Sequence, residues 1–405
     1  TTSYNTAIGS NAGYAITTAI NNTLIGGLAG DAITTGTNNT ALGYAALGAN
    51  TGAFSNIAIG VRALDAFNVT TATSTYNVAI GEDAGGAVTT GVQNTLLGGL
   101  AGDALTDADN NVAIGVQALT ADTLGSRSTA VGFNTLADQN FTTATDNYNT
   151  AVGYNAGGAI TTGVNNTLIG GLAGDALTTG GNNVVVGVDA LGTNILGSKN
   201  IAIGNAALFT SNPATATDTY NTAVGQAAGY AVTTGVQNTL IGGLAGDALT
   251  TGSYSVAVGY QALTTEDAHG QNTAVGYKAL ATLNAGATGN NVAIGFDAGT
   301  SVTTGINNTL IGSESGDALT DADHNTALGF RSLSTNVLGS RSVALGAGAL
   351  FAQNPATATD MYNVGIGYEA GVGVTTAIYN TLIGGLAGDA LTTGGYNVAI
   401  GTNSL

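Results

Sequence analysis

The chain has 405 residues, of which 64 are glycine and only 7 % are charged, and it contains no cysteine. Glycine is about twice as frequent, and charge about a quarter as frequent, as in an average soluble domain. Collagen is excluded because glycine does not recur at every third residue and only two prolines are present. Disorder is disfavoured because isoleucine, valine and leucine recur throughout. The lack of cysteine excludes disulfides, thiolate zinc sites and thiol catalysis.

The charge balance limits the possible partners. With 24 acidic and 6 basic residues, the net charge is −18. A nucleic-acid-binding protein needs a basic footprint, so we expect no nucleic-acid partner. No stretch approaches the roughly 18 apolar residues that a membrane-spanning helix requires, so we expect no membrane insertion.

A five-residue pattern organises the chain from residue 5 to its end. It reads Asn/Ser, then Thr/Val/Ile, then mostly Ala or Leu, then Ile/Val/Leu, then Gly, and it occurs 23 times. Successive copies are 17, 17, 17 and 21 residues apart, and this quartet recurs with a period of 72 residues, except that its fourth copy ends on a 19-residue unit. We call each unit a rung and number its positions from the Asn or Ser. The super-repeats are 5–76, 77–148, 149–220, 221–290, 291–362 and a partial 363–405.

This periodicity predicts an all-β fold, a parallel β-solenoid running as one continuous domain over residues 1–405. The alternation at positions two to four is typical of a short strand, with positions two and four on one side and position three on the other. We expect positions two and four to fill a thin core. Position three would then form an exposed column of Ala and Leu that needs a partner. The leucines of this column fall in the second rung of each super-repeat: Leu24, Leu96, Leu168, Leu240, Leu310 and Leu382.

The other positions of the rung also follow a pattern. Position five is glycine in all 23 rungs, which predicts a turn with positive φ or a close backbone approach. Position nine reads Gly, Gly, Leu, Leu over four rungs, and we expect the rungs with glycine to carry a second short strand. The fourth rung holds the extra residues, which should project from the coil and end in a tyrosine at 76, 148, 220 and 362.

The pentapeptides Asn77-Val78-Ala79-Ile80-Gly81 and Ser255-Val256-Ala257-Val258-Gly259 resemble a known repeat. They are similar to the Ser-Val-Ala-Ile-Gly repeats of trimeric autotransporter adhesin heads, and also to repeats of phage tail-fibre shafts. The resemblance covers residues 5–405 and implies a left-handed parallel β-roll, a homotrimer, and an extracellular place on a cell surface or a virion fibre. The rungs of this chain are longer than the usual head repeat of those adhesins.

Recurring polar and aromatic residues give two sets of candidate site residues. Aspartates at position ten of the second rung are interpreted as turn residues that bond nearby backbone N–H groups. The alternative is calcium binding, between chains or with the nearby Asp107 and Asp109. Tyrosines at position six either stack on sugars of a glycan or simply cover glycine-rich backbone. The aspartates at position ten, which we call the column aspartates, are Asp31, Asp103, Asp175, Asp247, Asp317 and Asp389. The tyrosines at position six are Tyr44, Tyr154, Tyr260, Tyr277 and Tyr368.

The remaining polar residues indicate no chemistry. We interpret His269 and His324 as solvated loop residues. The basic residues that close the third rung of three super-repeats, Arg127, Lys199 and Arg341, are expected to pair with nearby acids. No Ser/His/Asp set recurs and no P-loop lysine follows a glycine-rich turn, so we predict no enzymatic activity and, calcium apart, no cofactor.

Three functions stay open from the sequence. The first is adhesion or receptor binding by a rigid fibre that contacts a host surface or a glycan. The second is a purely structural filament or tail-fibre shaft. Because the chain starts and stops without a polar cap, we expect it to be either an excerpt of a longer chain or a unit that assembles end to end. The third, ice binding, is disfavoured because rungs with leucine at position nine lack the Thr-Thr pair seen at Thr17-Thr18 and Thr34-Thr35.

Overall fold

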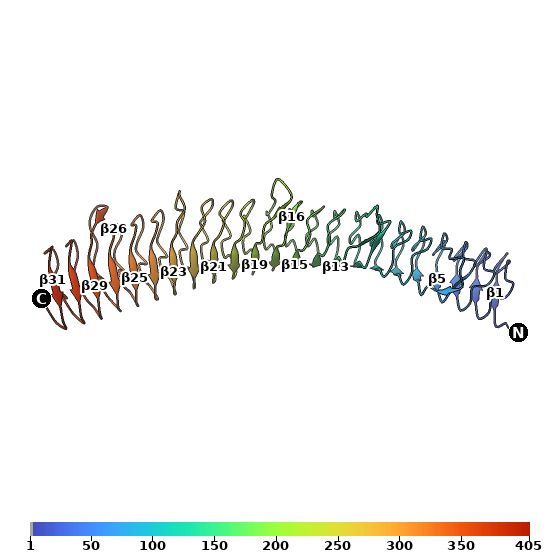
Figure 1. Ribbon diagram of the computed structural model, residues 1–405, viewed down its shortest axis with the longest axis horizontal. Helices are drawn as coiled ribbons and strands as arrows, with labels where there is room; N and C mark the ends of the chain where they lie inside the picture. The colour runs from blue at the N-terminus through green and yellow to red at the C-terminus, as the bar shows by residue number, and fades with distance from the viewer. Residues whose placement is uncertain (1–2) are drawn as a thin grey trace. The chain divides into compact units, whose positions relative to one another are not determined.

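The computed structural model describes residues 3–405, and all regular structure in them is β, with no helix. It contains two compact units, the first comprising residues up to Asn200 with Pro213–Asp218 and the second Ile201–Asn212 with Thr219–Leu405. Each unit is a solenoid of stacked rungs, with one three-residue strand per rung (Figure 1). The two units together hold 23 such strands, which confirms the predicted fold class.

In every rung the strand covers positions two to four. In the first unit these strands are β1 (Thr6–Ile8), β2 (Thr23–Ile25), β3 (Thr40–Leu42), β5 (Ile57–Ile59), β7 (Val78–Ile80), β8 (Thr95–Leu97), β9 (Val112–Ile114), β11 (Thr129–Val131), β13 (Thr150–Val152), β14 (Thr167–Ile169) and β15 (Val184–Val186). In the second unit they are β17 (Ile201–Ile203), β19 (Thr222–Val224), β20 (Thr239–Ile241), β21 (Val256–Val258), β22 (Thr273–Val275), β23 (Val292–Ile294), β24 (Thr309–Ile311), β25 (Thr326–Leu328), β27 (Val343–Leu345), β29 (Val364–Ile366), β30 (Thr381–Ile383) and β31 (Val398–Ile400).

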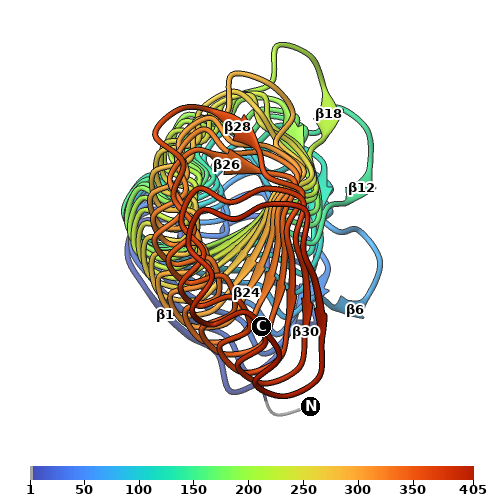
Figure 2. The ribbon, with the colours of Figure 1, turned by 90° about the vertical axis from the view of Figure 1, so that its left-hand side faces the viewer.

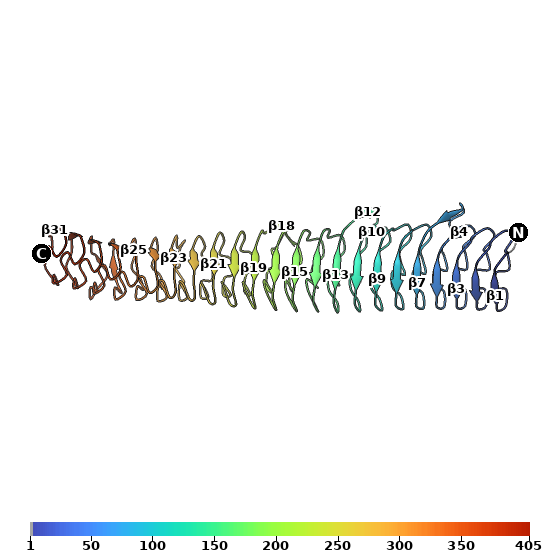
Figure 3. The same cartoon turned by 90° about the horizontal axis from the view of Figure 1, so that it is seen from below.

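The strands of each unit lie side by side as a parallel sheet in exact repeat register (Figure 3). In the first unit Thr23 pairs with Thr40 and Ile25 with Leu42, so each position meets the same position of the next rung. The same register holds in the second unit, where Ala257 pairs with Ala274.

Short second strands occur, but not in the rungs where we predicted them. They pair the third rung with the insert of the fourth: β4 (Ala53–Phe54) with β6 (Thr73–Ser74), β10 (Gly125–Ser126) with β12 (Thr145–Asp146), β16 (Gly197–Ser198) with β18 (Thr217–Asp218), and β26 (Gly339–Ser340) with β28 (Thr359–Asp360). In rungs with glycine at position nine, the corresponding segment bends too sharply. There the N–H groups of Thr17, Thr18 and Ala19 all converge on the carbonyl of Thr34, which prevents a ladder.

The inserts of the first unit, which carry β6, β12 and β18, stand out from the coil (Figure 2). The tyrosine that ends each 21-residue rung is exposed, as expected. These residues are Tyr76, Tyr148, Tyr220 and Tyr362. The 19-residue rung at 272–290, which is two residues shorter, carries no second strand.

The predicted orientation of the strand is wrong. From Leu24 to Ala399 the position-three residue is buried in every rung, whereas positions two and four are partly or well exposed. The coil is too narrow for two rows of β-branched side chains inside. Its interior instead holds the side chain of position three together with two other apolar side chains. These come from position nine, such as Leu47, and from position twelve on the wall opposite the strand, which we call the far wall, such as Ile33.

The order Gly, Gly, Leu, Leu at position nine of four successive rungs follows from how this interior packs. A Cβ at Gly13 or Gly30, at position nine, would lie 2.9 Å from a methyl of Leu24, at position three. Leu24 therefore occupies the space that both glycines leave. In the third and fourth rungs the sizes are reversed, because Ala41 at position three faces a core that contains Leu47 at position nine.

The glycine at position five satisfies both predicted conditions. Gly9 has a φ of +135°, and a Cβ there would lie 2.4 Å from the carbonyl oxygen of Gly26 in the next rung. The same contact recurs from rung to rung, for example between Gly153 and Gly170. Any side chain at position five would thus force the rungs apart.

Position one forms a buried ladder of amides, which the sequence did not lead us to expect. The side-chain oxygen of each Asn accepts the backbone N–H of the next position-one residue, as Asn22 does from Asn39 at 2.9 Å. The Nδ2 of Asn22 donates to the carbonyl of Gly36 across the coil at 2.9 Å. These bonds satisfy polar groups that would otherwise be costly to bury. In most rungs the ladder therefore ties the strand to the end of its own coil, as between Asn22 and Gly36.

Candidate functional site: an uncharged sheet face and its aromatic edge

The outer face of the sheet has a uniform composition along each unit. Positions two and four, which form it, hold only Thr, Val, Ile and Leu in all 23 rungs. Their side chains are open to solvent: Leu97 and Ile169 in the first unit are 41 % and 40 % exposed, and Leu328 in the second is 47 % exposed. We call this surface the open face. Parallel sheets are normally covered on both sides, so the open face lacks a partner within its own unit.

In eight of the 23 rungs an exposed aromatic side chain lies beside the open face at position six, directly after the glycine turn, and we call these residues the aromatic column. All five tyrosines that were predicted as glycan contacts lie in it and are exposed: Tyr44, Tyr154, Tyr260, Tyr277 and Tyr368. Some of them stack on one another. The ring of Tyr154 lies 5.8 Å from that of Phe133, and the rings of Tyr260 and Tyr277 are 5.9 Å apart, measured between centroids.

The alternative interpretation of these rings is supported for two of them. A Cβ added at Gly27 would lie 3.5 Å from the ring of Tyr44, and one at Gly243 would lie 3.5 Å from Tyr260. These rings cover the glycine of the preceding rung.

Three of the six aspartates at position ten accept a hydrogen bond from a hydroxyl group of the next rung. Ser334 donates its hydroxyl to Asp317 at 2.6 Å, and Thr120 and Thr264 donate theirs to Asp103 and Asp247. The partner is thus a hydroxyl group as well as the backbone. Burial raises the pKa of Asp317 above its ordinary value.

The column aspartates do not gather with the other two calcium candidates. Thr90 donates to Asp107, and the N–H of Val92 donates to Asp109 at 2.7 Å, so both carboxylates have partners in the preceding rung. Within residues 3–405, the single group of three or more potential metal ligands is formed by other residues, near His269.

That group consists of Glu266, Asp267 and His269, whose ligand atoms lie within 4.8 Å of one another. Glu266 is buried and accepts the backbone N–H groups of His269 at 3.0 Å and Ala285 at 3.4 Å, and burial raises its pKa. Glu266 occupies position twelve of its rung. At the same position in the first super-repeat, the side-chain oxygen of Asn50 accepts the backbone N–H of Ala53 at 3.0 Å. Glu266 is therefore a structural substitute for that asparagine. Its neighbour His269 is one-third exposed, and His324 is exposed.

The three basic residues at the ends of third rungs are paired as predicted. Arg127 contacts Asp146 at 2.9 Å, Lys199 contacts Asp218 at 2.7 Å, and Arg341 contacts Asp360 at 2.9 Å. Each pair joins a third rung to the insert of the following fourth rung. Arg127 and Arg341 also lie 5.7 Å and 5.9 Å from the ring centroids of the insert tyrosines 148 and 362. These cations hold the inserts in place.

No known protein family and no curated protein matches the chain. Among residues 3–405 there is no helix that could cross a membrane.

Proposed function

We propose that this chain is a non-enzymatic component of an extracellular fibre that self-associates through the open face. The observation that carries the proposal is the uninterrupted lack of charge at positions two and four over 23 rungs. Elsewhere the chain is strongly anionic, with 24 acidic residues against 6 basic ones. An uncharged strip of this kind, present in each unit of an anionic chain, is typical of an interface.

A second copy of the chain is the partner that fits the strip. Its own open face has the same rung repeat, so the apolar column of Ile, Val and Leu at position four of one copy can meet that of the other along the sheet. Each square ångström of apolar surface removed from water contributes roughly 25 cal/mol. The simplest closed arrangement in keeping with the resemblance to adhesin heads is a homotrimer, in which three open faces meet around one axis. End-to-end stacking into a filament or tail-fibre shaft is the alternative mode of self-association.

Adhesion is the second candidate function, and the aromatic column favours it. Its rings are exposed at the edge of the open face, where a host surface or a glycan could contact them. An adhesin of this type would be found on a cell surface or a virion fibre. Binding to an array of glycans would separate adhesion from a purely structural role.

Charged substitutions on the open face test self-association. In Leu97→Asp with Ile169→Asp, both new carboxylates lie on the open face of the first unit, where the native side chains are about 40 % exposed. We expect a folded protein with unchanged far-ultraviolet circular dichroism and a lower mass in sedimentation equilibrium. The physical reason is that two uncompensated charges would be buried in each interface.

A matched variant provides the control. Thr35→Asp with Thr179→Asp also adds two carboxylates at exposed positions of the same unit, but both lie at position fourteen, away from the open face. It should keep the mass of the wild type. Equal masses for the wild type and both variants, or equal losses in both variants, would contradict a role for the open face.

A further inference from the structure

The aromatic column contains a run of three stacked rings that sets its spacing. Tyr260, Tyr277 and Phe296 occupy position six of three successive rungs. The centroid of Tyr277 lies 5.9 Å from that of Tyr260 and 5.2 Å from that of Phe296, and the ring planes differ by 16° and 10°. Two rings that are two rungs apart thus hold one further ring between them.

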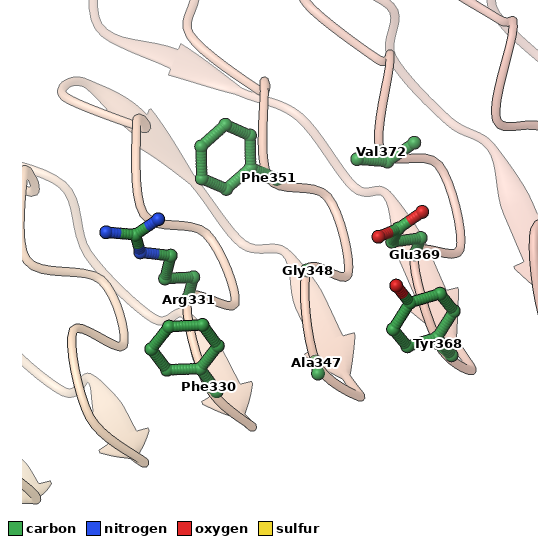
Figure 4. A pocket seen from close by; sticks show the side chains of 8 residues that line it. All are labelled: Phe330, Arg331, Ala347, Gly348, Phe351, Tyr368, Glu369 and Val372. Carbon is green, nitrogen blue, oxygen red and sulfur yellow. The ribbon is translucent and has the colours of Figure 1, made fainter.

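The same arrangement recurs with its central ring missing. Phe330, Ala347 and Tyr368 hold position six of three later rungs of the same unit, so an alanine lies between two exposed rings. The next position offers no replacement, because Gly348 lies there between Arg331 and Glu369. Figure 4 shows Ala347 and Gly348 at the bottom of the gap, with Phe330 on one side and Tyr368 on the other.

The gap is a hollow of about 340 Å³, which we call the ring slot. Its further walls are apolar and come from Phe351 and Val372, at position ten of the two later rungs. Small-molecule pockets have volumes of roughly 300–1,000 Å³, so the ring slot suits one ring system with short substituents.

Two charged groups border the ring slot. Arg331 is held in place, since its Nε donates to Glu314 at 2.6 Å and its guanidinium lies 5.2 Å from the centroid of Phe330. Glu369 accepts a hydrogen bond from the hydroxyl of Tyr368, which raises the pKa of that tyrosine. A carboxylate has lone pairs for more than one donor. Glu369 can therefore also accept a hydroxyl from a ligand.

A neighbouring gap in the column differs in one respect. Ser313 separates Phe296 from Phe330 in the same way as Ala347 separates Phe330 from Tyr368. The residue after Ser313 is Glu314, whereas a glycine follows Ala347. The carboxylate of Glu314 reaches the next rung and bonds Arg331. A side chain is thus present at position seven of this gap, where the ring slot has none.

We propose that the ring slot binds one planar aromatic ring that carries a hydroxyl group, a phenol, stacked between Phe330 and Tyr368. The phenol replaces the missing ring of the column, as Tyr277 fills the equivalent place in its own run. Its hydroxyl donates to Glu369. This inference is independent of self-association through the open face.

The test uses p-cresol as the probe and the full chain in its native assembly state. We expect saturable binding by calorimetry and by saturation-transfer NMR. Ala347→Tyr supplies the ring from the chain itself, and position six accepts tyrosine in other rungs. It should lower the affinity for p-cresol at least tenfold. Ser313→Tyr adds the same side chain to the neighbouring gap and should leave the affinity within about twofold.

Two further probes examine the chemistry. Glu369→Gln should weaken p-cresol but not 4-methylanisole, which has the same ring and no hydroxyl donor. N-acetyltyrosinamide distinguishes a free phenol from a peptide side chain as the ligand, and binding of either supports the ring slot. The proposal is overturned if p-cresol does not bind the wild type, if Ala347→Tyr and Ser313→Tyr have equal effects, or if methyl β-glucoside binds as tightly as p-cresol.

Discussion

At the scale of single residues, the interior of the coil is governed by size complementarity between positions three and nine. Leu168 illustrates it, because a Cβ at Gly157 would lie 2.6 Å from one of its methyls and a Cβ at Gly174 would lie 3.0 Å from another. One leucine per super-repeat thus fills the space of two glycines in adjacent rungs.

Removing such a leucine should leave a cavity that neighbouring glycines cannot fill. We expect Leu168→Ala to lower the free energy of unfolding by about 2–5 kcal/mol, measured by denaturant titration. Leu97→Ala removes the same atoms from the open face and should cost far less in the dissociated protein. Similar losses for the two variants would mean that position three is not the core of the coil.

A second residue-scale rule concerns the two fourth rungs in which the asparagine of the amide ladder is replaced by serine. At Ser128 the space is filled by Gln139, whose Nε2 donates to the Ser128 hydroxyl at 2.8 Å and whose Oε1 accepts from Asn149 at 2.9 Å. Ser342 has the same partner, Gln353, at 3.0 Å. Fourth rungs that keep asparagine have Phe67, Ser211 or Leu283 at that position instead.

This pairing predicts strong coupling between the two sites. Ser128→Asn alone should overpack the coil, and Gln139→Ser alone should leave buried polar groups without partners, each costing about 1–3 kcal/mol. The double variant reproduces the combination of Asn200 with Ser211. It should be more stable than the sum of the single effects by about 1 kcal/mol in a double-mutant cycle. Additive effects would disprove the compensation.

The residue pattern explains which features could be predicted. Position five had to be glycine for reasons visible in the sequence, and the structure confirms both the positive φ and the close approach at Gly9. Alternation with a period of two shows only that position three opposes positions two and four. It does not show which side faces inward, so the assignment of Leu24 to the outside was wrong. The reciprocal sizes at positions three and nine were the available signal.

At the scale of elements, the inserts depend on the third rung before them. Strand β12 pairs with β10, and Arg127 at the end of the third rung contacts Asp146 of β12. The sequence predicted the projection and the ion pair. It did not predict the second strands in these rungs, because their formation depends on how sharply the backbone bends at the far wall.

Removing the cation should loosen the insert without unfolding the coil. We expect Arg127→Ala to leave the melting temperature nearly unchanged, because exposed ion pairs contribute little to stability. Cleavage by chymotrypsin after Tyr148 should become faster. Arg62→Ala removes an arginine of the same side-chain exposure, which pairs with Asp83 at another corner, and serves as the control. Unchanged cleavage in Arg127→Ala would show that strand pairing alone holds the insert.

At the scale of the whole molecule, charge opposes contacts outside the open face. Each chain carries a net charge of −18, and an assembly multiplies it. Self-repulsion keeps such fibres apart at low salt, and it fades as the Debye length falls from about 30 Å at 0.01 M to about 8 Å at 0.15 M.

We therefore predict that calcium at millimolar concentration promotes lateral bundling and that a chelator reverses it. Divalent ions can bridge carboxylates such as Asp31 and Asp103 on facing fibres, which sodium cannot do. Light scattering against calcium and against sodium at matched ionic strength tests this prediction. Equal responses would indicate simple screening, and no response would show that surface charge does not govern association.

The mass of the wild-type protein in solution tests the central claim most directly. Sedimentation equilibrium at 0.15 M salt, over a wide range of protein concentrations, measures it without a label. Self-association through the open face as a homotrimer predicts about three times the chain mass of 39.3 kDa. A folded species of 39.3 kDa at every concentration would contradict the account, because the open face would then be stable without a partner.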